Sequence, residues 1–334
     1  MKLFEPLEIR NLRLESRLVA APLASASCTP EGVPTERTLE AGRKALSARP
    51  GLVVLEHHAV HPWGRVRVRQ LMLDRDDVTE GHRPLAGLFA EAGVPAVVQL
   101  NHGGSGVADP DLFGDPAFRM VAPSPVPHPG RDPGRIPEPL SEGQIRELPG
   151  FFVQAARRAR EAGYRGVQVH GCHGYLLGQF LSPLTNRRTD RYGGDVRGRS
   201  RLLLDVVDAV RGAFPDLPLG VRLGAADSFP GEEPRGLRVE EACAVARELA
   251  ALGADWIAVS GNLCGYDAPG GFGPYAGAIR EAVGKRIPVE CTGGVTSYAR
   301  ARELLDRGCC DLVGVGRLLL SDPAAAAAWR RDEA

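Results

Sequence analysis

Two histidines and a tyrosine lie within six residues of one another, directly after a short apolar run. The run, residues 167–169, has a glycine close to each end, which is typical of a buried strand. His170, His173 and Tyr175 therefore place several hydrogen-bond donors and one proton-bearing phenol at a strand end. In an α/β barrel, this is where the chemistry is located. The next stretch is irregular and polar for about twenty residues, too long for a plain connection, so we interpret it as a functional loop.

The elements that must position these side chains alternate regularly along the chain. Apolar runs predict strands, and amphipathic runs between them predict helices. Strict alternation indicates a parallel sheet closed into a single (β/α)8 TIM barrel. An open doubly wound sheet is the second choice, because no G-x-G-x-x-G follows the first strand. The predicted strands are residues 17–21, 51–56, 95–100, 165–170, 218–223, 255–260, 287–291 and 311–315, and the predicted helices are residues 35–48, 79–92, 141–162, 197–211, 238–252, 274–284, 297–307 and 322–330.

Two segments add to this barrel. Residues 3–17 predict a hairpin across the bottom of the barrel, since their Pro and Asn suit turns. Residues 103–140 are rich in Gly, Pro and Asp and predict a lid or a hairpin over the barrel mouth. Ser141 and Gln144 form a capping-box pattern at the start of the helix that follows. No boundary interrupts the pattern, so residues 1–334 are expected to form one domain.

The bulk composition is that of an ordinary globular protein. The 41 basic residues balance the 41 acidic ones, so neither nucleic acid nor a membrane surface is expected as a partner. No apolar run approaches the length of a membrane span, and the N-terminus lacks the apolar core of a signal peptide. We therefore expect a cytoplasmic protein. Its seven cysteines are odd in number and irregularly spaced, which argues against a disulfide framework.

Three histidines after the second predicted strand suggest a metal site. His57 and His58 are adjacent on a strand, so their side chains point to opposite faces and chelate poorly together. With His61 they are more compatible with a role in shaping a pocket. No metal is expected, although a metal-dependent barrel lyase or hydrolase using this cluster stays an alternative.

Four other residues stand out by their surroundings. Ala21 and Ala24 are small enough to let a flat ring lie close to the backbone, or simply to fill a barrel mouth. Gln99 lies inside an apolar strand, where its amide needs a partner, either on a neighbouring strand or in a ligand. Arg222 is similarly placed, and its buried guanidinium must be paired, for which an ion pair with a carboxylate is the plain structural interpretation.

The last two β–α units carry a phosphate-binding pattern. Glycines at 293, 294, 314 and 316 free backbone N–H groups to point at an anion, and helix N-termini add their dipoles. Arg317 supplies a charge-assisted contact. The loops after strands seven and eight are the usual phosphate site of this barrel. Two such loops with an arginine are a specific signal.

The segment HGCHGYLLGQFLSPLTNRRTDRYGG, residues 170–194, resembles the most diagnostic segment of the Old Yellow Enzyme family of FMN-dependent oxidoreductases. The resemblance extends over the whole chain and implies non-covalent FMN, with NADPH or NADH as electron donor. It also implies that His170 and His173 receive the carbonyl group of a small-molecule substrate and that Tyr175 donates a proton.

The same resemblance assigns a set of cofactor contacts. Relatives usually carry Thr or Cys at the position of Ala24 and Pro at the position of Leu318, so this chain departs from them at both. It places Gln99 and Arg222 at the polar edge of the flavin and Arg317 at its phosphate. The implied FMN-binding residues are Ala21, Pro22, Leu23, Ala24, Ala59, Gln99, His170, Arg222, Gly293, Gly294, Gly316 and Arg317.

The implied reaction is a ping-pong reduction of the activated C=C bond of α,β-unsaturated carbonyl compounds. An FMN-dependent dehydrogenase of a specialised metabolite, on the same scaffold, is the alternative. A homodimer or homotetramer is possible, with Arg330 or Arg331 as candidates for a contact to a neighbouring subunit's site. Tyr266 is either a residue that closes the pocket or a surface aromatic.

Overall fold

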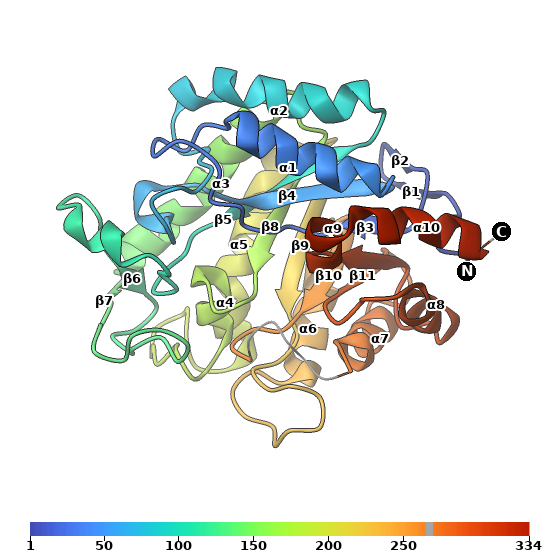
Figure 1. The fold of residues 1–334 in the computed structure, drawn as a ribbon. Helices are drawn as coiled ribbons and strands as arrows, with labels where there is room; N and C mark the ends of the chain where they lie inside the picture. The colour runs from blue at the N-terminus through green and yellow to red at the C-terminus, as the bar shows by residue number, and fades with distance from the viewer. Residues whose placement is uncertain (265–269, 334) are drawn as a thin grey trace.

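The computed structural model describes residues 1–264 and 270–333, and its centre is a closed barrel of parallel strands (Figure 1). Each strand pairs with the barrel strands before and after it in the sequence, and the last closes on the first. The barrel and all eight strand positions predicted from the sequence are confirmed. The strands are β3 (Leu18–Ala20), β4 (Leu52–Ala59), β5 (Ala96–Asn101), β8 (Gly166–Gly171), β9 (Leu219–Gly224), β10 (Trp256–Ser260), β11 (Val289–Thr292) and β12 (Leu312–Val315).

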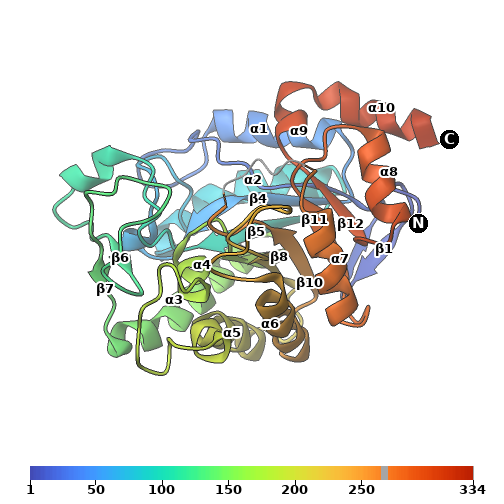
Figure 2. The ribbon, with the colours of Figure 1, turned by 90° about the horizontal axis from the view of Figure 1, so that it is seen from below.

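Helices follow the strands and cover the outside of the barrel. In Figure 2, α3, α5 and α6 lie on one side of the strands and α1 and α10 on the other. The eight predicted helices are confirmed to within a few residues, and the short helices α4 and α9 are additions. The α-helices are α1 (Glu36–Ser47), α2 (Thr79–Glu91), α3 (Glu142–Ala162), α4 (Leu176–Leu181), α5 (Val196–Ala213), α6 (Val239–Ala251), α7 (Gly273–Ala282), α8 (Tyr298–Asp306), α9 (Arg317–Ser321) and α10 (Pro323–Glu333).

The boundaries of α3 show how local sequence sets an element. The predicted capping box is present: Gln144 N–H donates to Ser141 Oγ, and Ser141 N–H donates to Gln144 Oε1. The helix ends at Gly163, whose φ of 102° is a left-handed conformation that favours glycine. α3 therefore begins and ends where its sequence requires.

The N-terminal hairpin closes the bottom of the barrel, as predicted. Its strands β1 (Leu7–Ile9) and β2 (Leu12–Leu14) pair antiparallel. Leu12 and Leu14 pack with the lower interior side chains of the barrel, including Trp256. A Cβ on Gly220 would lie 2.2 Å from Cε2 of that indole, so only glycine leaves room for the ring. The bottom half of the barrel is thus a packed apolar core.

The segment 103–140 forms a lid at the rim of the barrel rather than a hairpin. It contains the 3-10 helix η3 (Pro110–Gly114) and two short strands, β6 (Val121–Ala122) and β7 (Glu138–Pro139), which pair in parallel. Arg188 fastens it to the loop after α4, because its Nη1 donates to the carbonyl oxygens of Pro123 and Leu140 at 2.9 and 2.6 Å. Because β6 and β7 pair in parallel and the strands of a hairpin are antiparallel, the hairpin alternative was wrong.

The two ends of the chain lie side by side (Figure 1). Glu333 accepts hydrogen bonds from the backbone N–H groups of Leu3 and Phe4 at 2.8 and 2.9 Å. Arg330 lies over the Phe4 ring and donates to the carbonyl oxygen of Arg49, so its side chain is used within this chain. Oligomeric state stays a prediction. Within the described ranges, no helix combines the length and the apolar character needed to cross a membrane. Tyr266 lies outside the described residues.

Candidate active site

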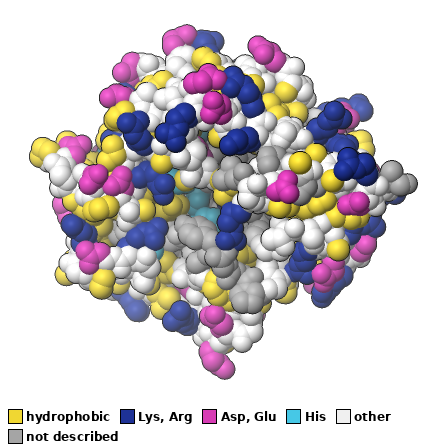
Figure 3. All heavy atoms as spheres, in the orientation of Figure 1, with side chains coloured by type: hydrophobic (Ala, Val, Ile, Leu, Met, Phe, Trp, Pro, Cys, Tyr) yellow, Lys and Arg dark blue, Asp and Glu magenta, His cyan; other side chains and the backbone are white. Residues whose placement is uncertain are grey.

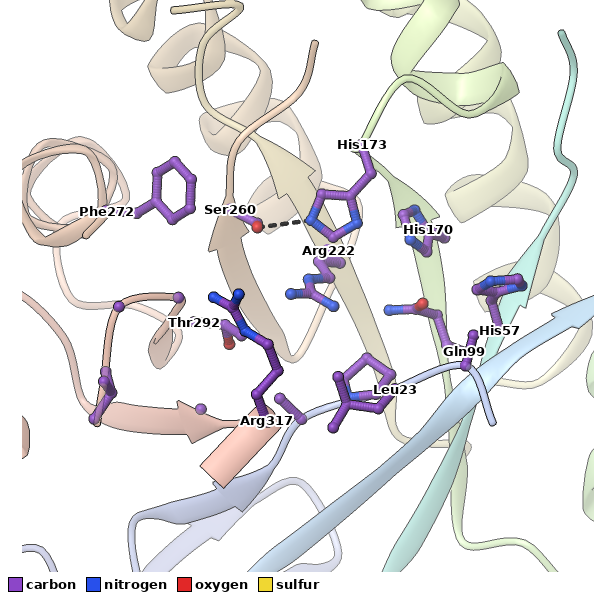
Figure 4. Close-up of a pocket in the computed structure, with 18 of the residues that line it drawn as sticks. Leu23, His57, Gln99, His170, His173, Arg222, Ser260, Phe272, Thr292 and Arg317 are labelled. Carbon is purple, nitrogen blue, oxygen red and sulfur yellow. Dashed lines mark hydrogen bonds between the residues drawn. The ribbon is translucent and has the colours of Figure 1, made fainter. Parts of the chain in front are cut away.

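A cavity of about 440 Å³ opens at the carboxyl ends of the barrel strands. It is large enough for a cofactor or a small substrate. Figure 4 shows side chains from both halves of the barrel pointing into this space. Its lining consists of Ala21, Pro22, Leu23, Ala24, His57, Arg67, Gln99, Arg131, His170, His173, Tyr175, Arg222, Ser260, Phe272, Thr292, Gly293, Gly294, Val295, Thr296, Gly314, Gly316, Arg317 and Leu318.

The structure brings together every residue that the sequence predicted for the site except Ala59. The three predicted catalytic residues form one cluster of rings. The His170 ring centroid is 5.1 Å from that of His173 and 5.0 Å from that of Tyr175. His170 lies on β8, and the other two follow it in the turn that leads to α4. The spacing of the motif thus folds three side chains back over one strand end.

This turn is strained and held in place. His173 has a φ of 57°, which is unusual for a residue with a side chain. Its N–H donates to the carbonyl oxygen of Gly261. At the next residue, the Gly174 carbonyl oxygen accepts from Gln179 Nε2 at 2.6 Å and from His128 Nε2 at 2.8 Å. The surrounding structure therefore fixes the direction of His173 and Tyr175 more tightly than a free loop could.

Both strand-end histidines are neutral at pH 7. Burial lowers the pKa of His170 and of His173 well below the ordinary value, and neighbouring positive groups, including Arg222, lower it further. A neutral imidazole has one N–H donor and one acceptor nitrogen. His173 Nε2 lies 2.8 Å from Ser260 Oγ, and His170 Nδ1 lies 3.7 Å from Cys172 Sγ. The pair therefore offers neutral hydrogen-bond donors to a ligand.

Gln99 has the partner on a neighbouring strand that its burial required. Its Nε2 donates to Gln168 Oε1 at 2.7 Å, on the adjacent strand β8. Gln99 also lines the cavity, so its amide faces both the barrel interior and the ligand space. The structural and ligand-binding interpretations are therefore compatible.

Arg222, unlike Gln99, has a buried side-chain nitrogen without a hydrogen-bond partner among the described residues. It is 7% exposed, its guanidinium lines the cavity, and none of the carboxylates among the described residues forms an ion pair with it. Its Nε is buried without a hydrogen-bond partner in the described part of the chain. The ion-pair interpretation was therefore wrong, and a buried, unpaired cation favours an anionic or electron-rich ligand group.

The predicted phosphate site has the expected backbone. Gly293 and Gly294 have φ values of 119° and 73°, which non-glycine residues rarely adopt. A Cβ on Gly293 would also lie 2.8 Å from the Phe272 ring. Gly316 and Arg317 approach the same end of the cavity from the final β–α unit. This end of the cavity is therefore suited to an anion.

The loop after β3 forms the opposite wall. Ala21 to Ala24 line the cavity, as predicted. The next residue is anchored, because Ser25 Oγ and N–H both donate to the buried carboxylate of Glu56 on β4. Burial raises the pKa of the Glu56 carboxyl, and the Ser25 hydrogen bonds oppose that shift. This anchor keeps a run of small and apolar side chains flat against the ligand space.

Ala59 is the exception, and its contact with the cofactor stays a prediction. Ala59 is fully buried at the end of β4, where its N–H donates to the carbonyl oxygen of Leu71, and it does not line the cavity. His57 lines the cavity instead. The pairing of β4 with β5 shifts by one residue between Leu55 and His57, and this β-bulge turns the imidazole inward.

The hydrogen bonds around His57 fix its tautomer. Val66 N–H donates to Gln70 Oε1 at 2.7 Å, so the amide group of Gln70 must donate through Nε2 to His57 Nδ1 at 2.8 Å. Burial lowers the pKa of His57 to about 4, and the charge of Arg67 contributes. His57 therefore keeps its proton on Nε2 and is a further neutral donor, which sequence reasoning noticed only as a possible pocket residue.

The three histidines of β4 and its loop do not gather around one point. His58 packs on the other face against His82, and His61 packs against Phe151. Opposite faces were predicted for His57 and His58 and are confirmed. The described residues whose ligand atoms do converge, all within 4.8 Å, are His170, Cys172 and His173.

Several cavity residues were missed. Arg67 and Arg131 lie in polar loops, where a charged side chain is usually solvated. Ser260 and Thr292 end strands β10 and β11, and this position at the carboxyl end of a barrel strand could have identified them.

The chain has clear relatives among known proteins. Residues 2–330 match the model of the NADH:flavin oxidoreductase / NADH oxidase family. An NADPH dehydrogenase of Geobacillus sp. (strain WCH70) is 35% identical over 329 residues, which cover 96% of this chain and 91% of that protein. An NADPH dehydrogenase of Bacillus subtilis (strain 168) is 33% identical over 327 residues, which cover 96% and 92%.

Solved structures give the same result. The Old Yellow Enzyme homologue from Zymomonas mobilis superimposes with a TM-score of 0.84 at 27% identity, over 99% of this chain and 93% of that one. Morphinone reductase in complex with tetrahydroNAD gives a TM-score of 0.81 at 29% identity, over 100% and 92%.

Proposed function

Because the chain belongs to the NADH:flavin oxidoreductase / NADH oxidase family, we propose that it reduces the activated C=C bond of α,β-unsaturated carbonyl compounds in a ping-pong reaction. FMN is its cofactor and NAD(P)H its electron donor. The observation that carries the proposal is the cluster of His170, His173 and Tyr175. It lies in the wall of the same cavity as the glycine-containing loops at 293–294 and 316–317.

The residues of the cavity fit FMN. Gly293, Gly294 and Arg317 would hold its phosphate, and Ala21 to Ala24 would lie along its ring. Arg222 would face the polar edge of the ring, where its unpartnered Nε and fixed positive charge suit a group that gains electron density. When bound, FMN would supply the hydride-transfer chemistry between NAD(P)H and the alkene.

His170 and His173 would bind the carbonyl oxygen of the substrate. His170 is buried and His173 half-buried, and the pKa of both lies well below the ordinary value, so each can donate one N–H without carrying a charge that would attract water or a counter-ion. Ser260 keeps the His173 ring oriented through the contact between its Oγ and Nε2. Two fixed donors at one oxygen polarise the conjugated double bond and stabilise the enolate that develops.

Tyr175 would supply the proton. Its ring is 5% exposed and lies beside those of His57 and His170, at centroid distances of 5.4 and 5.0 Å. A phenol has an ordinary pKa of about 10, which keeps its proton in place at neutral pH and suits transfer to a basic carbon next to the carbonyl. Residues 1–334 would act as one FMN-binding domain, with residues 103–140 as the lid that limits solvent access.

Replacing Tyr175 tests the proton-donor role. Tyr175→Phe is expected to slow oxidation of the reduced flavin by cyclohex-2-enone by about 100-fold or more, a usual size for general acid catalysis. Flavin reduction by NADPH should change less than twofold, because that step needs no proton from Tyr175. Anaerobic stopped-flow absorbance at the flavin band measures both steps. Equal alkene-dependent rates in wild type and variant would remove Tyr175 from the mechanism.

A second measurement tests the binding role of the histidines. Phenols resemble an enolate oxygen on a flat ring, so they should perturb the flavin spectrum when they bind beside it. His170→Ala is expected to weaken the binding of 4-hydroxybenzaldehyde about tenfold or more, the effect of losing one or two hydrogen bonds to a partly charged oxygen. An unaltered dissociation constant would contradict that role.

A further inference from the structure

Two arginines line the cavity but have no role in the proposed binding of FMN or of the substrate carbonyl group. The first is Arg67, in the loop after β4. It is half-buried, and its Nε is buried without a hydrogen-bond partner among residues 1–264 and 270–333. In the same part of the chain, no carboxylate pairs with its guanidinium. A cation that is partly withdrawn from water and unpaired is costly unless a ligand compensates it.

The second is Arg131, which the lid carries into the cavity wall. Its Nε donates to the carbonyl oxygen of Gly106 at 3.3 Å and its Nη1 to that of Gly130 at 3.0 Å. Gly106 lies directly against the Tyr175 ring, since a Cβ on it would be 2.8 Å from Cδ1 of that ring. Arg131 is therefore held beside the proposed proton donor, and among the described residues it also lacks an acidic partner.

The charge around these side chains has one sign. Of the described residues, the cavity lining includes four arginines and no aspartate or glutamate. Two acidic residues of the same loops have other partners: Asp109 accepts from the N–H groups of Val68 and Asp111, and Asp132 pairs with Arg135. Figure 3 shows histidine side chains at the bottom of a hollow with basic side chains around it. Such a rim attracts anions and raises their local concentration.

We propose that Arg67 and Arg131 form a second anion subsite, which takes a carboxylate or phosphate group on the ligand whose reacting end lies at His170 and His173. The inference rests on the proposed function. Guanidinium groups suit such oxyanions because their planar N–H donors can bind two oxygens at once. Two ligands of the reaction could supply the group: an unsaturated carbonyl substrate that carries a carboxylate, or the phosphates of NAD(P)H.

The test compares ligands that differ only in charge. The FMN-loaded variants Arg67→Gln and Arg131→Gln are titrated with cyclohex-2-enone and with the same enone carrying a carboxylate, and binding is followed by the change in the flavin spectrum. The concentration dependence of anaerobic flavin bleaching gives the dissociation constant of NADPH. The matched control is Arg69→Gln, which removes the same charge from an exposed neighbour that does not line this cavity.

Each outcome bears on the proposal. We expect each cavity variant to weaken one of the two anionic ligands about tenfold or more, the effect of losing one charge-assisted hydrogen bond. Weaker binding of the carboxylate enone alone identifies an acidic substrate, and weaker binding of NADPH alone identifies the dinucleotide. The affinity of each cavity variant for the neutral enone should change less than twofold. The affinity of the Arg69→Gln control should change less than twofold for every ligand.

Two results would overturn the subsite: unchanged affinity for both anionic ligands, or an equal loss for the neutral enone. FMN absorbance and melting temperature establish that each variant is folded. A wild-type protein that binds these ligands but reduces no enone would refute the proposed function and leave the subsite standing, because the affinities are measured without turnover.

Discussion

Glu290 is a buried acid directly beneath the cavity. Its replacement by glutamine should make the protein more stable than the wild type, by an amount that grows as pH rises. Glu290 lies on β11, is 1% exposed, and accepts a hydrogen bond through Oε1 from Thr292, which lines the cavity. Its Oε2 is buried without a partner in the described residues. Burial raises the pKa of the Glu290 carboxyl, and the Thr292 hydrogen bond and the charge of Arg222 only partly oppose the shift.

The sign of the effect follows from linkage. The unfolded chain loses the Glu290 proton near the ordinary pKa of 4.5, whereas the folded protein keeps it to a higher pH. Stability that is present below pH 4.5 is therefore lost as pH rises towards the folded-state pKa. The loss is about 1.4 kcal/mol for each pH unit in that window and then stays constant. Glu290→Gln keeps the shape of the protonated acid but cannot ionise, so it escapes this loss.

Thermal melting of wild type and Glu290→Gln at pH values from 4.5 to 8, with FMN in excess, measures the difference. The variant should match the wild type near pH 4.5 and melt at progressively higher temperature above it, by about 2 °C per pH unit at first. Glu40→Gln, at an exposed carboxylate on α1, is the control and should run parallel to wild type. Parallel curves for Glu290→Gln would refute the reasoning. A variant that becomes less stable as pH rises would show instead that Glu290 is ionised and stabilised by Arg222.

Three further outcomes are expected. Gly314→Ala would place a Cβ 2.0 Å from Thr292 Oγ1, so it should destabilise the protein by about 1–3 kcal/mol and weaken FMN retention, measured by melting and by flavin release on dilution. Gln70→Leu removes the bond that fixes the His57 tautomer and should weaken binding of a phenol to the oxidised enzyme about fivefold while FMN stays bound, measured by spectral titration. Ser141→Ala breaks the capping box of α3 and should cost about 1 kcal/mol in melting experiments without changing turnover.

Most of the fold could be predicted because local signals and global topology agree. Each apolar run became a barrel strand, and each amphipathic run became a helix outside it. The short helices α4 and α9 are exceptions, and α4 has six consecutive buried residues and therefore no polar face from which a helical period could be read. The lid was recognised by composition, but its internal pairing depends on contacts to distant side chains such as Arg188.

The site was predictable wherever residue type alone dictated a partner. A buried arginine in an apolar strand must meet a negative group, and Arg222 lines the cavity. Gly293 and Gly294 give an equally direct signal, because few other residues adopt their backbone angles. Arg67 and Arg131 gave no such signal, since an arginine in a polar loop is ordinarily solvated and only the folded chain shows which space it faces.

The bulge in β4 determines which histidine of this strand faces the ligand space. Val54 packs inside the barrel, so strict alternation would turn Glu56 and His58 inward as well. The one-residue shift before His57 reverses this order. It turns Glu56 outward to anchor Ser25, and it turns His57 into the cavity opposite Gln99. A single extra residue thus determines both the anchor of the cofactor loop and the identity of a cavity donor. Because a bulge shifts the two-residue period by one and has no composition of its own, the strand sequence alone could not show which histidine faces the ligand.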